Sequence, residues 1–182
     1  MGGQTGTSFW GAGEGGNLPD SPLIEGAEEA STFVVFALAG ESFAVEIGRV
    51  REIIRIPRIT WVPEAPRFVR GVINLRGSVV AVLDLAAILS LKSPVESSEG
   101  RIIIAETGDQ VAGMLVDSVS HVAEIKPSEI EQALRTLDED QRTYVIAQSN
   151  LDGALIGILD LEQVMESVRT VNADNKSNKE KG

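Results

Sequence analysis

The sequence predicts a mainly β protein that consists of two small β-barrels related by internal duplication, with short helices and a disordered tail at each end. The duplication is directly visible: NLRGSVVAVLDL at residues 74–85 matches NLDGALIGILDL at residues 150–161, without a gap and at a constant offset of 76. The apolar runs are short and separated by glycine turns, which is typical of closed sheets without exposed strand edges. Since 43% of the 182 residues are hydrophobic, the chain has enough apolar side chains for a core.

The two ends of the chain differ from its middle in composition. Residues 1–31 are rich in glycine and acidic residues and contain no Lys or Arg, and residues 172–182 are also polar. Such segments bury too little apolar surface to offset an ordering entropy of roughly 1–2 kcal/mol per residue. We therefore expect two disordered tails around a folded domain at residues 32–171. Its two barrel subdomains are expected at roughly 32–95 and 96–171, with an exchange of strands between them left open.

Each half is expected to begin with a β-hairpin, because two β-rich runs are joined there by a turn that contains glycine. The runs and their turns are residues 33–36, Gly40 and 43–45 in the first half, and residues 102–105, Gly108 and 111–116 in the second.

Each copy of the repeat then reads as an extended stretch, a glycine turn, an apolar strand and a short helix. The helices are predicted from apolar residues spaced i, i+3 and i+4: Leu85, Ile88 and Leu89, and Leu161, Val164 and Met165. Asp84 and Asp160 immediately precede these stripes. We interpret both as N-cap residues, whose carboxylates accept backbone N–H groups and contribute about 0.5–2 kcal/mol. The alternative is a pair of carboxylates for acid–base catalysis.

One longer helix is predicted from Ser128 to about Asp138. Ser128 and Glu131 have the spacing of a capping box, and Pro127 stands just before it. The apolar stripe of this helix would be Ile130, Ala133, Leu134 and Leu137.

The composition argues against an enzyme. There is no cysteine, which excludes disulfides, thiolate nucleophiles and Cys-ligated zinc and fits a reducing compartment. His121 is the one histidine, so no site can use two imidazoles. We interpret it as a structural or surface residue. No glycine-rich phosphate loop occurs. No secretory signal and no apolar run of the ~20 residues needed to cross a bilayer are present. We predict no catalytic, cofactor-binding or metal-binding residues.

Seven arginines form a basic island at residues 49–76 of a chain with net charge −11: Arg49, Arg51, Arg55, Arg58, Arg67, Arg70 and Arg76. Nucleic acid is an unfavourable partner, because the remaining core is negative and only Trp61 and Phe68 are available for base stacking. A solvated strand face and a protein-docking surface remain. Arg76 corresponds to Asp152 in the other copy. This difference predicts that the two barrels face different partners.

The central motif resembles the signature of the chemotaxis coupling protein family CheW, also called the CheW-like domain family. The motif is VRGVINLRGSVVAVLDL at residues 69–85, and VREII at 50–54, WVPEAP at 61–66 and GMLVDSV at 113–119 agree with it. The resemblance covers residues 32 to about 168. It implies two five-stranded SH3-like barrels, and it is weaker at Ala147, where the family usually has glycine, and at the predicted helix, where a proline-rich loop is common.

The resemblance also implies a function. Family members are non-enzymatic adaptors that link the cytoplasmic tips of chemoreceptors (methyl-accepting chemotaxis proteins) to the histidine kinase CheA, in cytoplasmic arrays that reach the membrane through the receptors. No cofactor and no nucleic acid are implied. The alternatives are a CheW-like scaffold of a non-chemotaxis pathway, a small-barrel nucleic-acid-binding protein that uses the arginine island, and a hydrolase based on Asp84 and Asp160.

Three receptor-binding residues follow from the resemblance: Val50 and Glu52 of the VREII strand and Arg76 of the NLRG turn. A helical partner docks with apolar side chains in a groove and charges at its rim. Val50 suits the floor of such a groove, and Glu52 and Arg76 suit its rim. The kinase contact is expected to pair a barrel of this chain with a barrel of the kinase's regulatory domain, and its residues are left unassigned.

Overall fold

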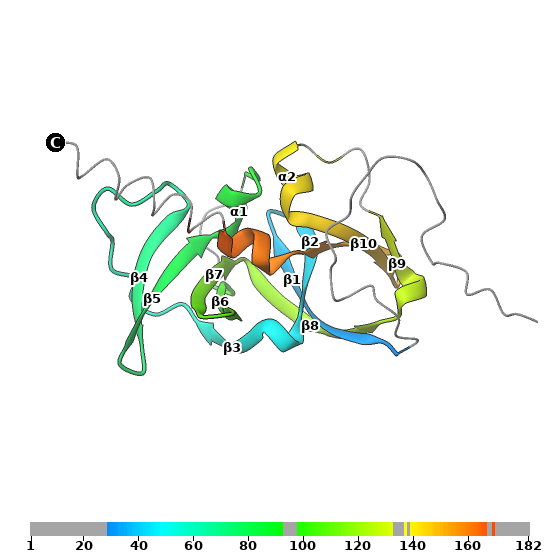
Figure 1. Cartoon of the computed structure of the whole chain (residues 1–182), viewed down its shortest axis with the longest axis horizontal. Helices are drawn as coiled ribbons and strands as arrows, with labels where there is room; N and C mark the ends of the chain where they lie inside the picture. Colours follow the sequence, from blue (N-terminus) through cyan, green and yellow to red (C-terminus); the bar gives the residue numbers. More distant parts are fainter. Residues whose placement is uncertain (1–28, 93–97, 133–136, 138, 167–168, 170–182) are drawn as a thin grey trace, which may run out of the picture.

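The computed structural model describes residues 29–92, 98–132, 137, 139–166 and 169 (Figure 1). The chain is mainly β, as predicted, and its strands form one sheet of six and one of five. Of the predicted tails, residues 1–28 and 172–182 lie outside the described residues. Ser31, which was assigned to the first tail, already belongs to the first strand. None of the helices in the described part is long and apolar enough to cross a membrane.

The two sheets have simple strand orders. The first contains, in spatial order, β8 (Ser118–Ile125), β1 (Ser31–Leu38), β2 (Glu41–Glu46), β11 (Ala154–Leu159), β10 (Val145–Leu151) and β9 (Ile130–Gln132). The second contains β3 (Val50–Arg55), β6 (Arg101–Thr107), β7 (Gln110–Val116), β5 (Ser78–Asp84) and β4 (Val69–Leu75). Short helical segments are η1 (Ile47–Arg49), α1 (Leu85–Ile88), η2 (Pro127–Glu129), α2 (Glu139–Tyr144) and residues 161–166.

The halves of the chain exchange their hairpins. Both predicted hairpins are present, as β1–β2 and β6–β7. The hairpin of the first half pairs in parallel with β11 of the second, where Phe43 faces Gly157. The hairpin of the second half pairs in parallel with β5 of the first, where Gly113 faces Val82. Each sheet therefore combines strands from both halves, and the sheets do not divide at the boundary expected near residue 95.

The internal repeat extends further in the structure than in the aligned sequence segments. The Asp84 N–H donates to the Phe68 carbonyl at 2.7 Å, and the Asp160 N–H donates to the Tyr144 carbonyl at 2.9 Å. Phe68 and Tyr144 have the same offset of 76 as the two aspartates. The register of β4–β5 shifts after Val69 and that of β10–β11 shifts at the equivalent Val145. A common irregularity at equivalent positions supports duplication of one supersecondary unit.

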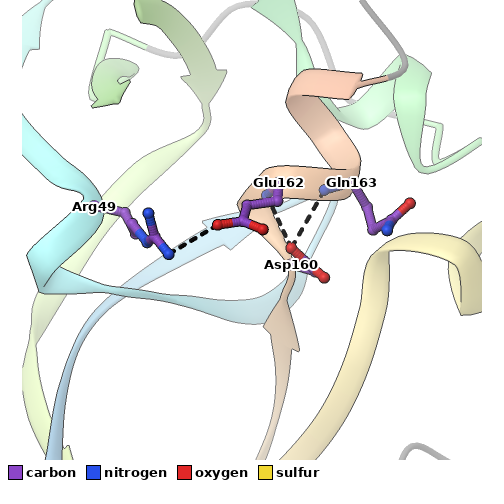
Figure 2. Close-up of polar contacts among 4 residues, drawn as sticks. All are labelled: Arg49, Asp160, Glu162 and Gln163. Atoms are coloured by element: carbon purple, nitrogen blue, oxygen red, sulfur yellow. Dashed lines mark hydrogen bonds and ion pairs between the residues drawn. The ribbon is translucent and has the colours of Figure 1, made fainter. Parts of the chain in front are cut away.

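Both aspartates act as N-caps, which confirms that prediction. The Asp84 carboxylate accepts the Ala87 N–H at 3.0 Å. The Asp160 carboxylate accepts the N–H groups of Glu162 at 2.8 Å and Gln163 at 3.3 Å, as Figure 2 shows. Each cap satisfies donors that the first helical turn leaves without an intrahelical partner.

The predicted helix from Ser128 to about Asp138 is wrong. The Glu129 carboxylate accepts the Lys126 N–H at 2.8 Å, so the N-cap is Lys126, two residues before Ser128, and the helical turn ends at Glu129. Ile130 then enters β9, which pairs with β10 and buries the Ile130 side chain. Pairing with an open sheet edge outweighs the local helical pattern here. The first sheet thereby has six strands rather than the predicted five; residues 133–136 and 138 lie outside the described part.

One large hydrophobic core joins the two sheets. The apolar stripes of both repeat helices lie in it, together with Phe36 and Phe43 from the first sheet and Ile103 and Met114 from the second. Each sheet has a smaller cluster of its own. Because the hairpins are exchanged and the main core is shared, the two sheets form one packed body.

Candidate functional site

The predicted receptor-binding residues of β3 lie on an edge strand. Val50, Glu52 and Ile54 are half-buried, and the alternate residues of β3 are exposed. Val50 packs against the main core. The side chain of Glu52 is 25% exposed, so its carboxylate sits at the boundary between core and solvent. The register of β3 against β6 shifts between Val50 and Glu52, which pair with the adjacent residues Ala105 and Ile104, so the two side chains lie on opposite faces of the sheet.

Arg76 lies at the tip of the β4–β5 hairpin. Arg76 and Gly77 both have positive φ, 51° and 88°, which is the conformation of a type I′ hairpin turn. The Asn74 side-chain carbonyl accepts the Gly77 N–H at 2.8 Å and holds this turn. The other copy has the same arrangement, with the Asn150 side chain accepting the Gly153 N–H at 3.1 Å. The repeat therefore fixes the backbone and leaves the residue at position 76 free to vary in charge.

Glu52 and Arg76 form an ion pair, with the guanidinium nitrogen 3.0 Å from the carboxylate oxygen. Because β3 and β4 are the two ends of the five-stranded sheet, this pair joins one sheet end to the hairpin at the other. The segment after β3 approaches β4 as well, since Thr60 and Val72 exchange two backbone hydrogen bonds of 2.8 Å. The structure thus brings Glu52 and Arg76 into contact, whereas Val50 packs against the main core.

The ion pair contributes little to the stability of the fold and mainly holds the Arg76 side chain in position. The Arg76 side chain is 80% exposed, and exposed pairs contribute about 0–1 kcal/mol. A guanidinium has five N–H donors, so one contact with Glu52 leaves donors available for a carboxylate or carbonyl of a partner. The site is an edge strand with half-buried residues beside an exposed cation, which suits the docking of a helix.

A second ion pair lies just before the start of β3. Arg49 in η1 contacts Glu162 at 2.8 Å, and Glu162 also donates its backbone N–H to Asp160 (Figure 2). This contact links the segment before β3 to the helix that follows β11. Sequence reasoning missed it, because the two residues are 113 positions apart and no local pattern relates them.

Two exposed apolar residues also escaped the sequence reading. Val79 is 74% exposed and Leu155 is 52% exposed. They are equivalent under the offset of 76, one residue after the start of β5 and of β11. Both could have been predicted from the alternation of strand residues along the aligned repeat, because the next residue of each strand is buried.

The residues considered for catalysis do not form a reactive site. Asp84 and Asp160 each cap a different helix, so their carboxylates are already used as acceptors. His121 lies exposed on the edge strand β8. Within the residues that the structure describes, no group of three or more His, Cys, Asp or Glu side chains is placed to hold a metal ion.

Comparison with known proteins points to one family. The sequence profile of the CheW-like domain family matches residues 32–169. The chemotaxis protein CheW of Helicobacter pylori is 32% identical over 143 residues, which cover 78% of this chain and 86% of that protein. CheW of Bacillus subtilis is 31% identical over 140 residues, 77% of this chain and 90% of that protein. The crystal structure of the scaffolding protein TtCheW from Thermoanaerobacter tengcongensis has a TM-score of 0.66 and 34% identity, over 72% of this chain and 89% of that chain.

Proposed function

Because the chain belongs to the CheW-like domain family, we propose that it couples the cytoplasmic tips of chemoreceptors to the histidine kinase CheA and so controls kinase activity. Its relatives carry the names of chemotaxis proteins and of a scaffolding protein, which supports a chemotaxis adaptor rather than an enzyme. The proposed place of action is the cytoplasmic side of chemoreceptor arrays, with the membrane reached through the receptors.

The Glu52–Arg76 pair is the observation that carries the receptor contact. It brings together two residues that the family resemblance assigns to receptor binding, from segments 24 positions apart. Val50 lies two residues before Glu52 on the same edge strand and is half-buried. In the proposed complex, a receptor helix packs along this strand, and Arg76 orients it through an acidic or carbonyl group.

Transmission requires that the adaptor respond as one body. A change in receptor state alters kinase activity only if it changes the relative free energies of two kinase conformations. The shared core and the exchanged hairpins make this chain a rigid link between two surfaces. We propose that the kinase contact pairs a barrel of this chain with a barrel of the kinase's regulatory domain.

Co-sedimentation with receptor cytoplasmic fragments tests the receptor contact. The full chain should sediment with the fragments, and Arg76→Glu should weaken binding by about tenfold or more, because it removes the presented cation and repels Glu52. Asp152→Lys is the matched control, since Asp152 occupies the equivalent turn of the other copy. The control should bind normally. Equal binding by the wild type and Arg76→Glu would contradict this receptor face.

A further inference from the structure

The seven arginines of the basic island fall into two groups by their partners. Four form ion pairs with carboxylates, at distances from 2.8 to 3.9 Å: Arg49, Arg51, Arg70 and Arg76. The other three are exposed, and the described part of the chain gives them no carboxylate partner: Arg55, Arg58 and Arg67. Arg55 is the last residue of β3, and Arg58 and Arg67 lie on the segment that joins β3 to β4. Within the basic island, the arginines without a carboxylate partner therefore lie at the end of β3 and on the connection that follows it.

The same connection presents an exposed aromatic side chain. Trp61 is 71% exposed. It lines a surface groove of about 440 Å³ together with Ile59, Ala65, Pro66 and Val69, and the rim carries Arg67 and Arg70. We call this feature the Trp61 groove. Single exposed apolar residues are common, but a tryptophan in a groove with an arginine rim has the composition of an interaction hot spot.

The chemistry of the Trp61 groove selects an acidic segment with large apolar side chains. Residues 1–28 of this chain have that chemistry: they contain Glu14, Asp20, Glu25 and Glu28, no Lys or Arg, and the apolar pairs Phe9–Trp10 and Leu23–Ile24. The segment 55–70 has the opposite balance, with four arginines and one acidic residue. Opposite charges of this kind attract across an interface and set its orientation.

The length of the segment allows it to reach the groove. The described chain begins at residue 29, just before β1 in the first sheet, whereas β4 lies toward the other end of the molecule (Figure 1). A stretch of 28 residues spans up to ~90 Å when extended. A compact domain of about 140 residues is ~40 Å across. The segment is therefore long enough to pass from the first sheet to the connection between β3 and β4.

We propose that residues 1–28 bind in the Trp61 groove of the same molecule. An apolar side chain of the segment packs on Trp61, and its carboxylates pair with Arg58 and Arg67. Because the segment is covalently attached, its effective concentration at the groove is high, so a weak contact is sufficient. Binding depends on charge and is therefore weakened by salt. It covers a surface next to β4, separate from the Glu52–Arg76 pair.

Energy transfer within the full chain tests this proposal, because the chain has two tryptophans and no cysteine. Trp10→Phe leaves Trp61 as the single donor, and Ser21→Cys provides one site for an acceptor dye. Transfer from Trp61 to the dye should be efficient at low salt. It should fall toward its high-salt value in Arg58→Glu/Arg67→Glu. The matched control, Lys92→Glu/Lys126→Glu, reverses two exposed charges elsewhere and should keep the transfer high.

Two outcomes would overturn the proposal. The first is transfer that is the same at low salt, at high salt and in Arg58→Glu/Arg67→Glu. The second is transfer that rises with protein concentration, which would assign the groove to a second copy. Acrylamide quenching of Trp61 in the unlabelled Trp10→Phe chain gives an independent readout: neutralising Glu14, Asp20, Glu25 and Glu28 to amides should increase it. Neither readout needs a receptor or a kinase, so failure here leaves the proposed function untouched.

Discussion

Arg76 and Asp152 occupy the same turn conformation in the two copies of the repeat, with φ of 51° and 52°, yet they carry opposite charges. The turn geometry needs the following glycine and the preceding asparagine, and it places no demand on the charge at this position. A residue that is free structurally and differs between the copies is available for function. This is the physical reason to assign Arg76 to partner binding.

Reversing the charges of Glu52 and Arg76 distinguishes two roles for Arg76: direct contact with the receptor, and formation of the ion pair alone. Arg76→Glu should change the free energy of unfolding by less than about 1 kcal/mol, because the pair is exposed. The double variant Glu52→Arg/Arg76→Glu rebuilds an ion pair with opposite polarity. If Arg76 contacts the receptor directly, the double variant should fold normally and still bind receptor fragments poorly. Restored binding in sedimentation, with urea unfolding as the folding control, would mean that only the pair matters.

Gly71 shows how close packing constrains one copy and not the other. Gly71 has φ of 143°, and a Cβ added there meets the carbonyl oxygen of Thr60. Gly71→Ala should therefore lower the free energy of unfolding by more than about 2 kcal/mol. Ala147 holds the equivalent position, and Ala147→Gly should cost about 1 kcal/mol. Urea unfolding of both variants checks this; equal effects would contradict the close contact between the Thr60 segment and β4.

At the scale of elements, the repeat made the prediction possible. Hairpins, turns, strands and N-caps follow from local patterns that the two copies share, and the structure confirms them. The segment at Ile130 could not be predicted in this way, because its apolar spacing fits a helix and only the open edge of β10 makes it a strand. The parallel pairing of the hairpins and the Arg49–Glu162 contact also depend on tertiary arrangement.

The two N-caps should contribute similarly to stability. Asp84→Ala and Asp160→Ala should each lower the free energy of unfolding by about 0.5–2 kcal/mol, since each aspartate accepts backbone N–H groups of a first helical turn. Chemical denaturation measures both. Asn at either position keeps an acceptor and should retain most of the stability. A fully stable alanine variant would argue against the capping role.

At the scale of the molecule, the exchanged hairpins and the shared core predict one cooperative unit. Unfolding followed by Trp61 fluorescence in the Trp10→Phe chain reports the connection beside the five-stranded sheet, and far-ultraviolet circular dichroism reports both sheets. The two transitions should coincide, because both sheets pack on one shared hydrophobic core. Two separate transitions would show that the sheets are independent and would remove the basis for a rigid link.

Kinase activity in a reconstituted mixture tests the central claim most directly. Receptor cytoplasmic fragments, the kinase CheA and the full chain would be combined, and autophosphorylation of the kinase would be measured. We predict activation that requires all three components and falls about tenfold or more with Arg76→Glu. Kinase activity that is the same with and without the chain would contradict a coupling adaptor, and full activation with Arg76→Glu would contradict the receptor face at Glu52 and Arg76.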